Sequence, residues 1–286
     1  MDDHDLALSV YAGSVPHGWP TPEGPAKAFF ERHFCPTRVS HGTVGHLTGY
    51  FEPVISAARS QSPEYCWPLY PQPDETENRH LPTRQHIDKG ALSYLPPIAW
   101  LSSKVDAYVL HVQGSGRLVF PDGQMCRVGF AGKNGHPYVS IGKILVNSGE
   151  VPASEISLDA IRNWCAQNPD RVDWLFWQNP SYIFFKETET NAPQNGPIGS
   201  AGVPLTPDRS LAVDQGYYEM GCPIWMSAAG KQQLMVAQDT GSAIKGSQRA
   251  DLFVGTGSTA GTIAGSLNQA VDLIALLPSK FARRDV

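Results

Sequence analysis

Apolar residues recur at helical spacing in several parts of the chain. Pro25 stands at a favourable first helical position, Ser157 is a favourable N-cap, and Gly149 is a favourable terminator. We expect helices over residues 25–34, 140–150, 157–167 and 262–277, with shorter ones beginning near Thr83 and passing through Leu175 and Phe176.

Alternating and β-branched apolar runs predict strands elsewhere. Residues 107–112 (AYVLHV) are β-branched and aromatic, and Pro121-Asp122-Gly123 lies between two further apolar runs, which is a hairpin signal. We expect strands at 43–50, 107–112, 178–186, 203–213, 223–226 and 233–236, and a hairpin over 117–132. The C-terminal third is therefore predicted to be β-structure with turns before its final helix.

Glycine and proline divide the chain into two units. Gly49 and Pro53 enclose two aromatic residues where a strand leaves one unit for another. After Lys186 the chain becomes polar and rich in Gly and Pro, which is typical of a linker. We expect residues 51–188 to form a unit inserted between residues 1–50 and 189–286.

Composition excludes several classes of function. The 286 residues are 41% hydrophobic and 17% charged, as in an ordinary globular protein, and the net charge of −5 argues against a nucleic-acid partner. The longest apolar run, 270–277, is too short to span a bilayer, and the acidic start MDDHD is unlike a secretory signal. We therefore expect either a cytoplasmic protein or a mature form with an added Met1.

No pattern predicts a metal or a cofactor. The five cysteines show no CxxC or Cys/His ligand spacing, and the nine histidines show no HExxH. Gly255, Gly257 and Gly261 resemble a dinucleotide loop only superficially, because the chain ends before a second parallel strand. Gly132-Lys133 lacks the spacing of a phosphate-binding loop.

Candidate chemistry concentrates in residues 236–265, where Asp239 and Asp251 are embedded in glycine. A backbone that folds tightly around an acid shields it from water, which raises its pKa and lets it donate a proton near neutral pH. The alternative is that both are turn residues. Asp214, Asp239 and Asp251 each end an apolar strand-like segment, and this recurrence favours a shared site.

Five long motifs resemble, in order, the family of bacterial membrane-bound lytic transglycosylase A with its C-terminal three-aspartate module. They are GYFEPV (49–54), HVQGSGRLVF (111–120), GFAGKNGHPYVSIGKIL (129–145), NPSYIFFKE (179–187) and AQDTGSAIKGSQRADLFVGTGSTAGTIAG (237–265). The resemblance implies a mainly β fold, with a double-psi β-barrel, a second inserted β-rich domain and a substrate groove between them.

The resemblance also implies cleavage of the β-1,4 bond between N-acetylmuramic acid and N-acetylglucosamine in peptidoglycan, leaving a 1,6-anhydro sugar. The acid/base aspartate of the family falls on Asp251. Because the attacking group is the sugar's own C6 hydroxyl, one carboxyl can protonate the leaving oxygen and then accept the hydroxyl proton. Asp239 is expected to organise the site, and Asp214 to be structural.

The remaining candidates are polar or aromatic residues in the matching motifs. Lys245 either orients a substrate carbonyl or is a solvated loop charge. The expected glycan contacts, for each of which a structural role is the alternative, are Thr48, Tyr50, Gln113, Ser115, Lys133, Asn134 and Tyr138.

Two other functions compete with this interpretation. Asp239-Thr240-Gly241 resembles the active-site motif of aspartic proteases, but such enzymes need two copies and the chain has one. Related barrels also bind polysaccharide without cleaving it. The resemblance implies a periplasmic protein that acts on glycan strands and is tethered to the outer membrane by a lipid anchor. No lipobox occurs and Cys35 lies inside the domain, so we expect that the anchor was removed or that this member lacks one. We also expect a monomer.

Overall fold

Strands from the two ends of the chain form one seven-stranded sheet in the computed structural model, which describes residues 23–40, 44–74, 81–188 and 196–280. Its strands are β1 (Phe34–Thr37), β2 (Gly45–Glu52), β9 (Ser210–Val213), β10 (Pro223–Ala228), β11 (Lys231–Asp239), β12 (Arg249–Thr256) and β13 (Asn268–Pro278). Because β13 pairs with both β10 and β2, the order β13-β10-β11-β9-β12-β2 closes on itself as a barrel. Its interior is apolar and includes Leu47, Leu211, Met235, Ala250 and Leu273.

The middle of the chain forms a second sheet of six strands, in the order β4-β5-β3-β6-β7-β8. These strands are β3 (Val54–Ala58), β4 (Trp67–Leu69), β5 (Ala99–Leu101), β6 (Ser115–Val119), β7 (Met125–Lys133) and β8 (Ile183–Thr188). The mainly β class with two β-rich parts is therefore confirmed. The boundaries at residues 50/51 and 188/189 stay a prediction, although only Pro53 separates β2 from β3.

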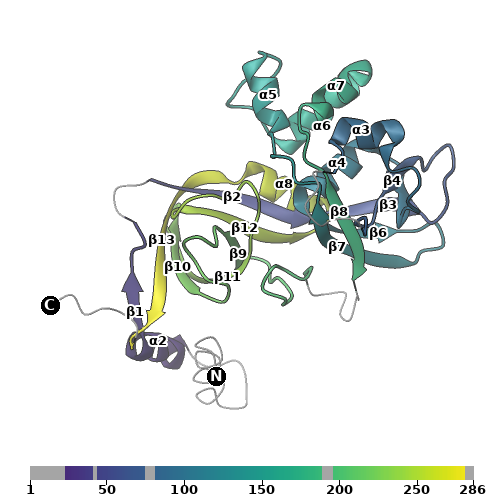
Figure 1. Ribbon diagram of the computed structural model, residues 1–286. Coiled ribbons are helices and arrows are strands. Elements are labelled where there is room, and N and C mark those ends of the chain that lie inside the picture. The colour runs from purple at the N-terminus through teal and green to yellow at the C-terminus, as the bar shows by residue number, and fades with distance from the viewer. Residues whose placement is uncertain (1–22, 41–43, 75–80, 189–195, 281–286) are drawn as a thin grey trace.

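Most helices accompany the second sheet, where α5, α6 and α7 form a group at the top of Figure 1. The helices are α2 (Glu23–His33), α3 (Arg84–His86) continued by a π turn (Ile87–Ala91), α4 (Lys104–Gln113), α5 (Ile141–Asn147), α6 (Leu158–Gln167), a 3-10 turn (Pro169–Arg171), α7 (Val172–Trp177) and α8 (Ser258–Ser266). Helix α8 packs against β2 and β12 of the barrel.

Local capping signals located several of these helices correctly. The Ser140 hydroxyl accepts a hydrogen bond from the Lys143 amide (3.3 Å), and the Ser157 hydroxyl accepts one from the Ala160 amide (3.1 Å). Gly149 follows α5 with a φ of 72°, which glycine adopts without strain. The expected hairpin is also confirmed, with β6 and β7 antiparallel.

The strand expected at 107–112 is wrong, because this segment lies in α4. Ser103 caps the helix by accepting from the Asp106 amide, and Gly114 ends it in the left-handed region. Val105, Tyr108 and Val112 follow at helical spacing and line one cavity. The β-branched composition was outweighed by the caps and this periodicity.

The helix expected over 262–277 is half wrong, because α8 ends at Ser266 and the rest is β13. Val271, Leu273 and Ala275 alternate into the barrel core, and β13 pairs with β1, β2 and β10. Asp251 also lies within β12 rather than at the end of a strand, and β8 starts later than expected, at Ile183.

Glu52 joins the two sheets through a buried charge cluster. Its carboxylate is fully buried and accepts from the Arg127 Nε (2.5 Å), the Arg117 Nε (2.8 Å) and the Thr256 hydroxyl (2.7 Å). Arg117 and Arg127 come from β6 and β7, whereas Thr256 comes from β12. A buried acid is tolerable only with such partners.

We predict that Glu52→Gln destabilises the fold by about 3–5 kcal/mol, since it removes the carboxylate that offsets two desolvated guanidinium groups. Chemical denaturation measures the change. The matched control is Glu187→Gln, which breaks a partly exposed pair with Arg59 and is expected to cost about 0–1 kcal/mol. Equal losses in the two variants would contradict a structural role for the Glu52 cluster.

Candidate active site

The carboxyl of Asp251 is held by the neighbouring strand β2. Asp251 and Thr48 are register partners in the parallel β12–β2 pair. The Thr48 hydroxyl donates to Asp251 Oδ1 (2.6 Å) and accepts from Arg249 Nη2 (2.7 Å). Among the described residues no donor reaches Asp251 Oδ2, so this oxygen is the one that can carry a proton.

Burial raises the pKa of the Asp251 carboxyl. The Thr48 hydrogen bond and the charges of Arg249 and His46 act in the opposite direction, and the nearby charge of Asp239 adds to the rise. Desolvation is the largest of these effects, so the protonated form of this carboxyl is more favoured in the site than it would be in water. Asp251 therefore has the property expected of a proton donor.

Asp239, at the end of β11, accepts four hydrogen bonds. Tyr50 donates its hydroxyl to Oδ2 (3.0 Å), while Oδ1 accepts from the Ser200 amide (3.1 Å), the Ser200 hydroxyl (2.8 Å) and the Thr240 amide (2.9 Å). Burial, and then the Asp239 charge, raise the pKa of Tyr50, which keeps its hydroxyl a donor. Asp239 is therefore a fixed acceptor beside Asp251 rather than a free nucleophile.

Asp214 links the loop that contains Gly216 to the loop that contains Gly246. Its carboxylate accepts from the Gly246 amide (2.8 Å) and the Gly216 amide (3.1 Å), and Lys245 Nζ lies 3.6 Å away. The two amides, and then Lys245, lower the pKa of Asp214. The Lys245 side chain is 68% exposed beside Asp214, which favours a loop charge over a substrate contact.

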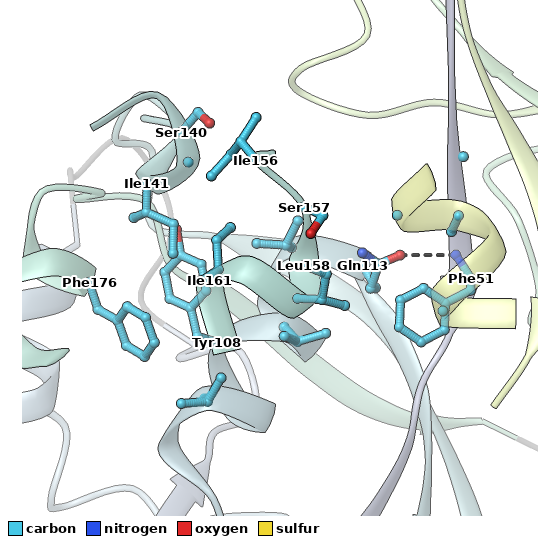
Figure 2. Close-up of a pocket in the computed structure, with 18 of the residues that line it drawn as sticks. Phe51, Tyr108, Gln113, Ser140, Ile141, Ile156, Ser157, Leu158, Ile161 and Phe176 are labelled. Atoms are coloured by element: carbon cyan, nitrogen blue, oxygen red, sulfur yellow. Dashed lines mark hydrogen bonds between the residues drawn. The ribbon is translucent and has the colours of Figure 1, made fainter. Parts of the chain in front are cut away.

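A cavity of about 260 Å³ lies between β2 and α8 on one side and α4, α5 and α6 on the other (Figure 2). Phe51, Ala264 and Gly261 line it from the barrel, and Tyr108 and Leu158 are among the residues that line it from the other side. None of its lining residues is acidic. Side chains alternate along a strand, so the cavity lies on the face of β2 opposite to the aspartates.

The other predicted contacts divide between the cavity and the surrounding fold. Gln113 and Tyr138 line the cavity, and Gln113 Oε1 accepts from the Phe51 amide (3.0 Å), as Figure 2 shows. Ser115 begins β6, and Lys133 is exposed at the end of β7. The structure brings only Thr48 and Tyr50 together with Asp239 and Asp251.

The prediction that Asn134 contacts the glycan is corrected, because its carboxamide is buried and hydrogen-bonded within the fold. Its Nδ2 donates to the carbonyls of Pro82 and Pro180 (both 2.9 Å), and its Oδ1 accepts from the Tyr182 amide (2.9 Å). At 1% exposure it cannot meet a glycan. A polar turn such as residues 133–138 is typical of both a glycan contact and a structural role.

Sequence reasoning missed Ser200 and Arg249, which contact the two aspartates and Thr48. Ser200 lies in the polar stretch after β8, and nothing in the composition of that stretch distinguishes this serine as a site residue. Within the described ranges, no three His, Cys, Asp or Glu side chains gather as metal ligands, and all five cysteines are free thiols.

We predict opposite effects of pH on the stability of two Asp→Asn variants. The raised pKa of Asp251 means that the folded state loses stability as pH rises above the ordinary Asp value of about 3.9, so Asp251→Asn raises Tm at pH 7 and has less effect at pH 4. The pKa of Asp214 is lowered, so its ionised carboxylate stabilises the folded state above the ordinary Asp value, and this stabilisation is lost as pH falls. Asp214→Asn is therefore expected to lower Tm at pH 7 and to have less effect in acid.

Thermal denaturation of both variants across this pH range measures the two trends, and each variant is the control for the other. In a chain of this size each kcal/mol changes Tm by about 2–4 °C. A fall of Tm at pH 7 in Asp251→Asn would contradict the desolvated state of that carboxyl.

Two family models and several known proteins match this chain. The family described as MltA specific insert domain matches residues 46–186, and the 3D domain family matches residues 209–277. Membrane-bound lytic murein transglycosylase A of Escherichia coli strain K12 is 38% identical over 242 residues, which are 80% of this chain. The chain spans 64% of the length of that curated relative.

Solved structures extend the likeness over the fold. The membrane-bound lytic murein transglycosylase from Agrobacterium tumefaciens aligns with a TM-score of 0.83 at 34% identity, over 96% of this chain and 83% of that one. The E. coli protein with bound chitohexaose aligns with a TM-score of 0.74 at 35% identity, over 82% of this chain and 72% of that one. The chain belongs to the membrane-bound lytic murein transglycosylase A family.

Proposed function

We propose that the protein is a lytic transglycosylase that cleaves the MurNAc–GlcNAc β-1,4 bond of peptidoglycan without water. The observation that carries the proposal is the difference between two acids. Asp251 has a raised pKa and an Oδ2 that no described donor reaches, whereas Asp239 accepts four hydrogen bonds. The solved E. coli relative with bound chitohexaose supports a glycan as the substrate.

The reaction then needs one carboxyl in two roles. Asp251 Oδ2 gives its proton to the glycosidic oxygen as the bond to C1 breaks. The resulting carboxylate takes the proton from the C6 hydroxyl of the same sugar, and O6 bonds to C1 to form the 1,6-anhydro ring. The proton returns to Asp251, and the atoms of the substrate are divided between two products without addition of water.

Hydrolysis fits this site less well. A water-using glycosidase needs a second carboxylate as nucleophile or base, and the hydrogen bonds to Asp239 leave it no such freedom. An aspartic protease needs two aspartates from like loops that share a proton. Asp251 instead lies within strand β12, and its Oδ1 is bound to Thr48.

The place of action follows from the proposed substrate. Peptidoglycan lies in the periplasm, so we propose that the protein works there, near the outer membrane. None of the helices in the described parts of the chain is long and apolar enough to cross a bilayer. A monomer acting on glycan strands remains our expectation.

We predict that Asp251→Asn lowers the rate of product release from purified sacculi by at least about 100-fold, since it removes the transferable proton. The matched control is Asp122→Asn in the exposed turn between β6 and β7, which is expected to keep full activity. Mass spectrometry of the products identifies the anhydro end by its lack of one water.

Running the same digestion in water enriched in heavy oxygen separates the possible functions. Our proposal predicts no label in the new sugar end. Labelled ends would indicate a hydrolase, and sacculi that are bound but never cleaved would indicate a binding module.

We also predict that Thr48→Val moves the alkaline limb of the pH–rate profile to higher pH. Asp251 must be protonated to start the reaction, and the Thr48 hydrogen bond lowers the pKa of that carboxyl. Valine matches threonine in volume, so the change removes the hydroxyl that donates to Asp251 and accepts from Arg249 Nη2. Thr262→Val, on the exposed face of α8, is the control and should leave the limb in place. A shift to lower pH in Thr48→Val would contradict the assignment.

A further inference from the structure

Arg249 lies two residues before Asp251 on β12, and therefore on the same face of that strand. The register partner of Arg249 on β2 is His46, whereas Asp251 is paired with Thr48. The long arginine side chain spans this offset, and its Nη2 donates to the Thr48 hydroxyl (2.7 Å). In the described part of the chain, no hydrogen bond joins Arg249 directly to Asp251, so the two groups are linked through Thr48.

Backbone carbonyls hold the guanidinium of Arg249 in place. Its Nη1 donates to the carbonyl of Ala250 and, at a longer distance, to that of His46 (3.4 Å). These acceptors belong to β12 and β2, so the pairing of the two strands fixes them. Burial lowers the pKa of Arg249 and the charge of Asp251 raises it, but a guanidinium stays protonated in either case. A positive charge is therefore fixed beside Thr48.

The guanidinium determines which way the Thr48 hydroxyl points. Arginine has donors only, so Thr48 Oγ1 must accept from Nη2, and its single proton is left for Asp251 Oδ1, which lies 2.6 Å away. A hydroxyl without such a neighbour is free to turn and to accept a proton from Oδ1 of the neutral acid. A cationic donor opposes this reversal, because it polarises the hydroxyl and strengthens its donation.

Few other charges face the carboxyl of Asp251. They are His46 and Tyr50 on β2 and Asp239 on β11, whereas β9 and α8, which also pack against β12, carry no titratable side chain. The Tyr50 hydroxyl donates to Asp239, and the exposed His46 ring is hydrogen-bonded to β13. Among these described groups, Arg249 is therefore the cation that acts on the carboxyl through a hydrogen bond.

We propose that Arg249 is a positioning residue that directs the Thr48 hydroxyl proton onto Asp251 Oδ1 and so leaves the acid's own proton on Oδ2. The inference rests on the proposed function, because a proton donor benefits from carrying its proton on one defined oxygen. Once that proton has moved to the glycosidic oxygen, the polarised hydroxyl stabilises the remaining carboxylate until it takes the proton of the C6 hydroxyl. Arg249 thus supports both roles of one carboxyl.

A double-mutant cycle on the full chain tests this role, with carbon-13 NMR titration of the Asp251 carboxyl as the readout. Arg249→Met removes the cation and is expected to raise the pKa of Asp251 by at least about 0.5 pH unit, because the hydrogen bond to the charged form weakens. In the Thr48→Val background, the same change is expected to add less than about half of that shift, since the link is already broken.

Two further variants serve as controls. Arg249→Lys keeps a charged donor and is expected to stay nearer to wild type than Arg249→Met. Arg209→Met removes an exposed arginine of the same barrel that donates to the Leu234 carbonyl (3.2 Å), and it should leave the titration unchanged. If Arg249→Met does not fold, Arg249→Gln takes its place in the cycle with the same expected sign.

The proposal is overturned by equal shifts in the two Thr48 backgrounds, which would show a charge acting directly on Asp251. No shift, a shift to lower pH, or an equal shift in Arg209→Met would also overturn it. The titration does not depend on glycan cleavage, so a wild-type chain that fails to cleave sacculi refutes the proposed reaction while the cycle still decides the role of Arg249. A wild-type chain that cleaves, with no shift in Arg249→Met, refutes this inference alone.

Discussion

The parallel pairing of β2 with β12 is the constraint on which both the fold and the site depend. It sets Thr48 opposite Asp251, Tyr50 opposite Phe253 and Glu52 opposite Thr256. The alternate position Gly49 faces α8, where an added Cβ would come within 2.9 Å of the Ala264 backbone. A slip of one residue would exchange these two sets of side chains, so the register is strongly specified.

Three acids of the barrel have different local partners. Backbone amides stabilise the ionised form of Asp214, whereas four donors from three residues engage Asp239. Asp251 receives one hydroxyl and is desolvated, and this burial disfavours its charged form. The proposed proton donor is thus selected by what surrounds each carboxyl rather than by the sequence next to it.

Local signals predicted the capped helices well, since Ser140, Ser157 and Gly149 act on neighbouring residues. Composition misled the prediction at α4, where the caps Ser103 and Gly114 outweighed it, and at β13, where pairing with distant strands did. Asp251 was identified through long motifs, but its contact with Thr48 joins positions 203 apart in sequence. Arg84 and His111 line one cavity although they are far apart in sequence, so no local pattern predicted it.

The protonation state of Asp251 is the central claim, and it can be observed directly. Carbon-13 labelling of aspartate, with Asp251→Asn used to assign the signal, gives the titration curve of this carboxyl in the intact chain by NMR. Our account predicts a pKa above the ordinary Asp value of about 3.9. Titration at or below that value would contradict it, because the site would then hold a carboxylate with no proton to give.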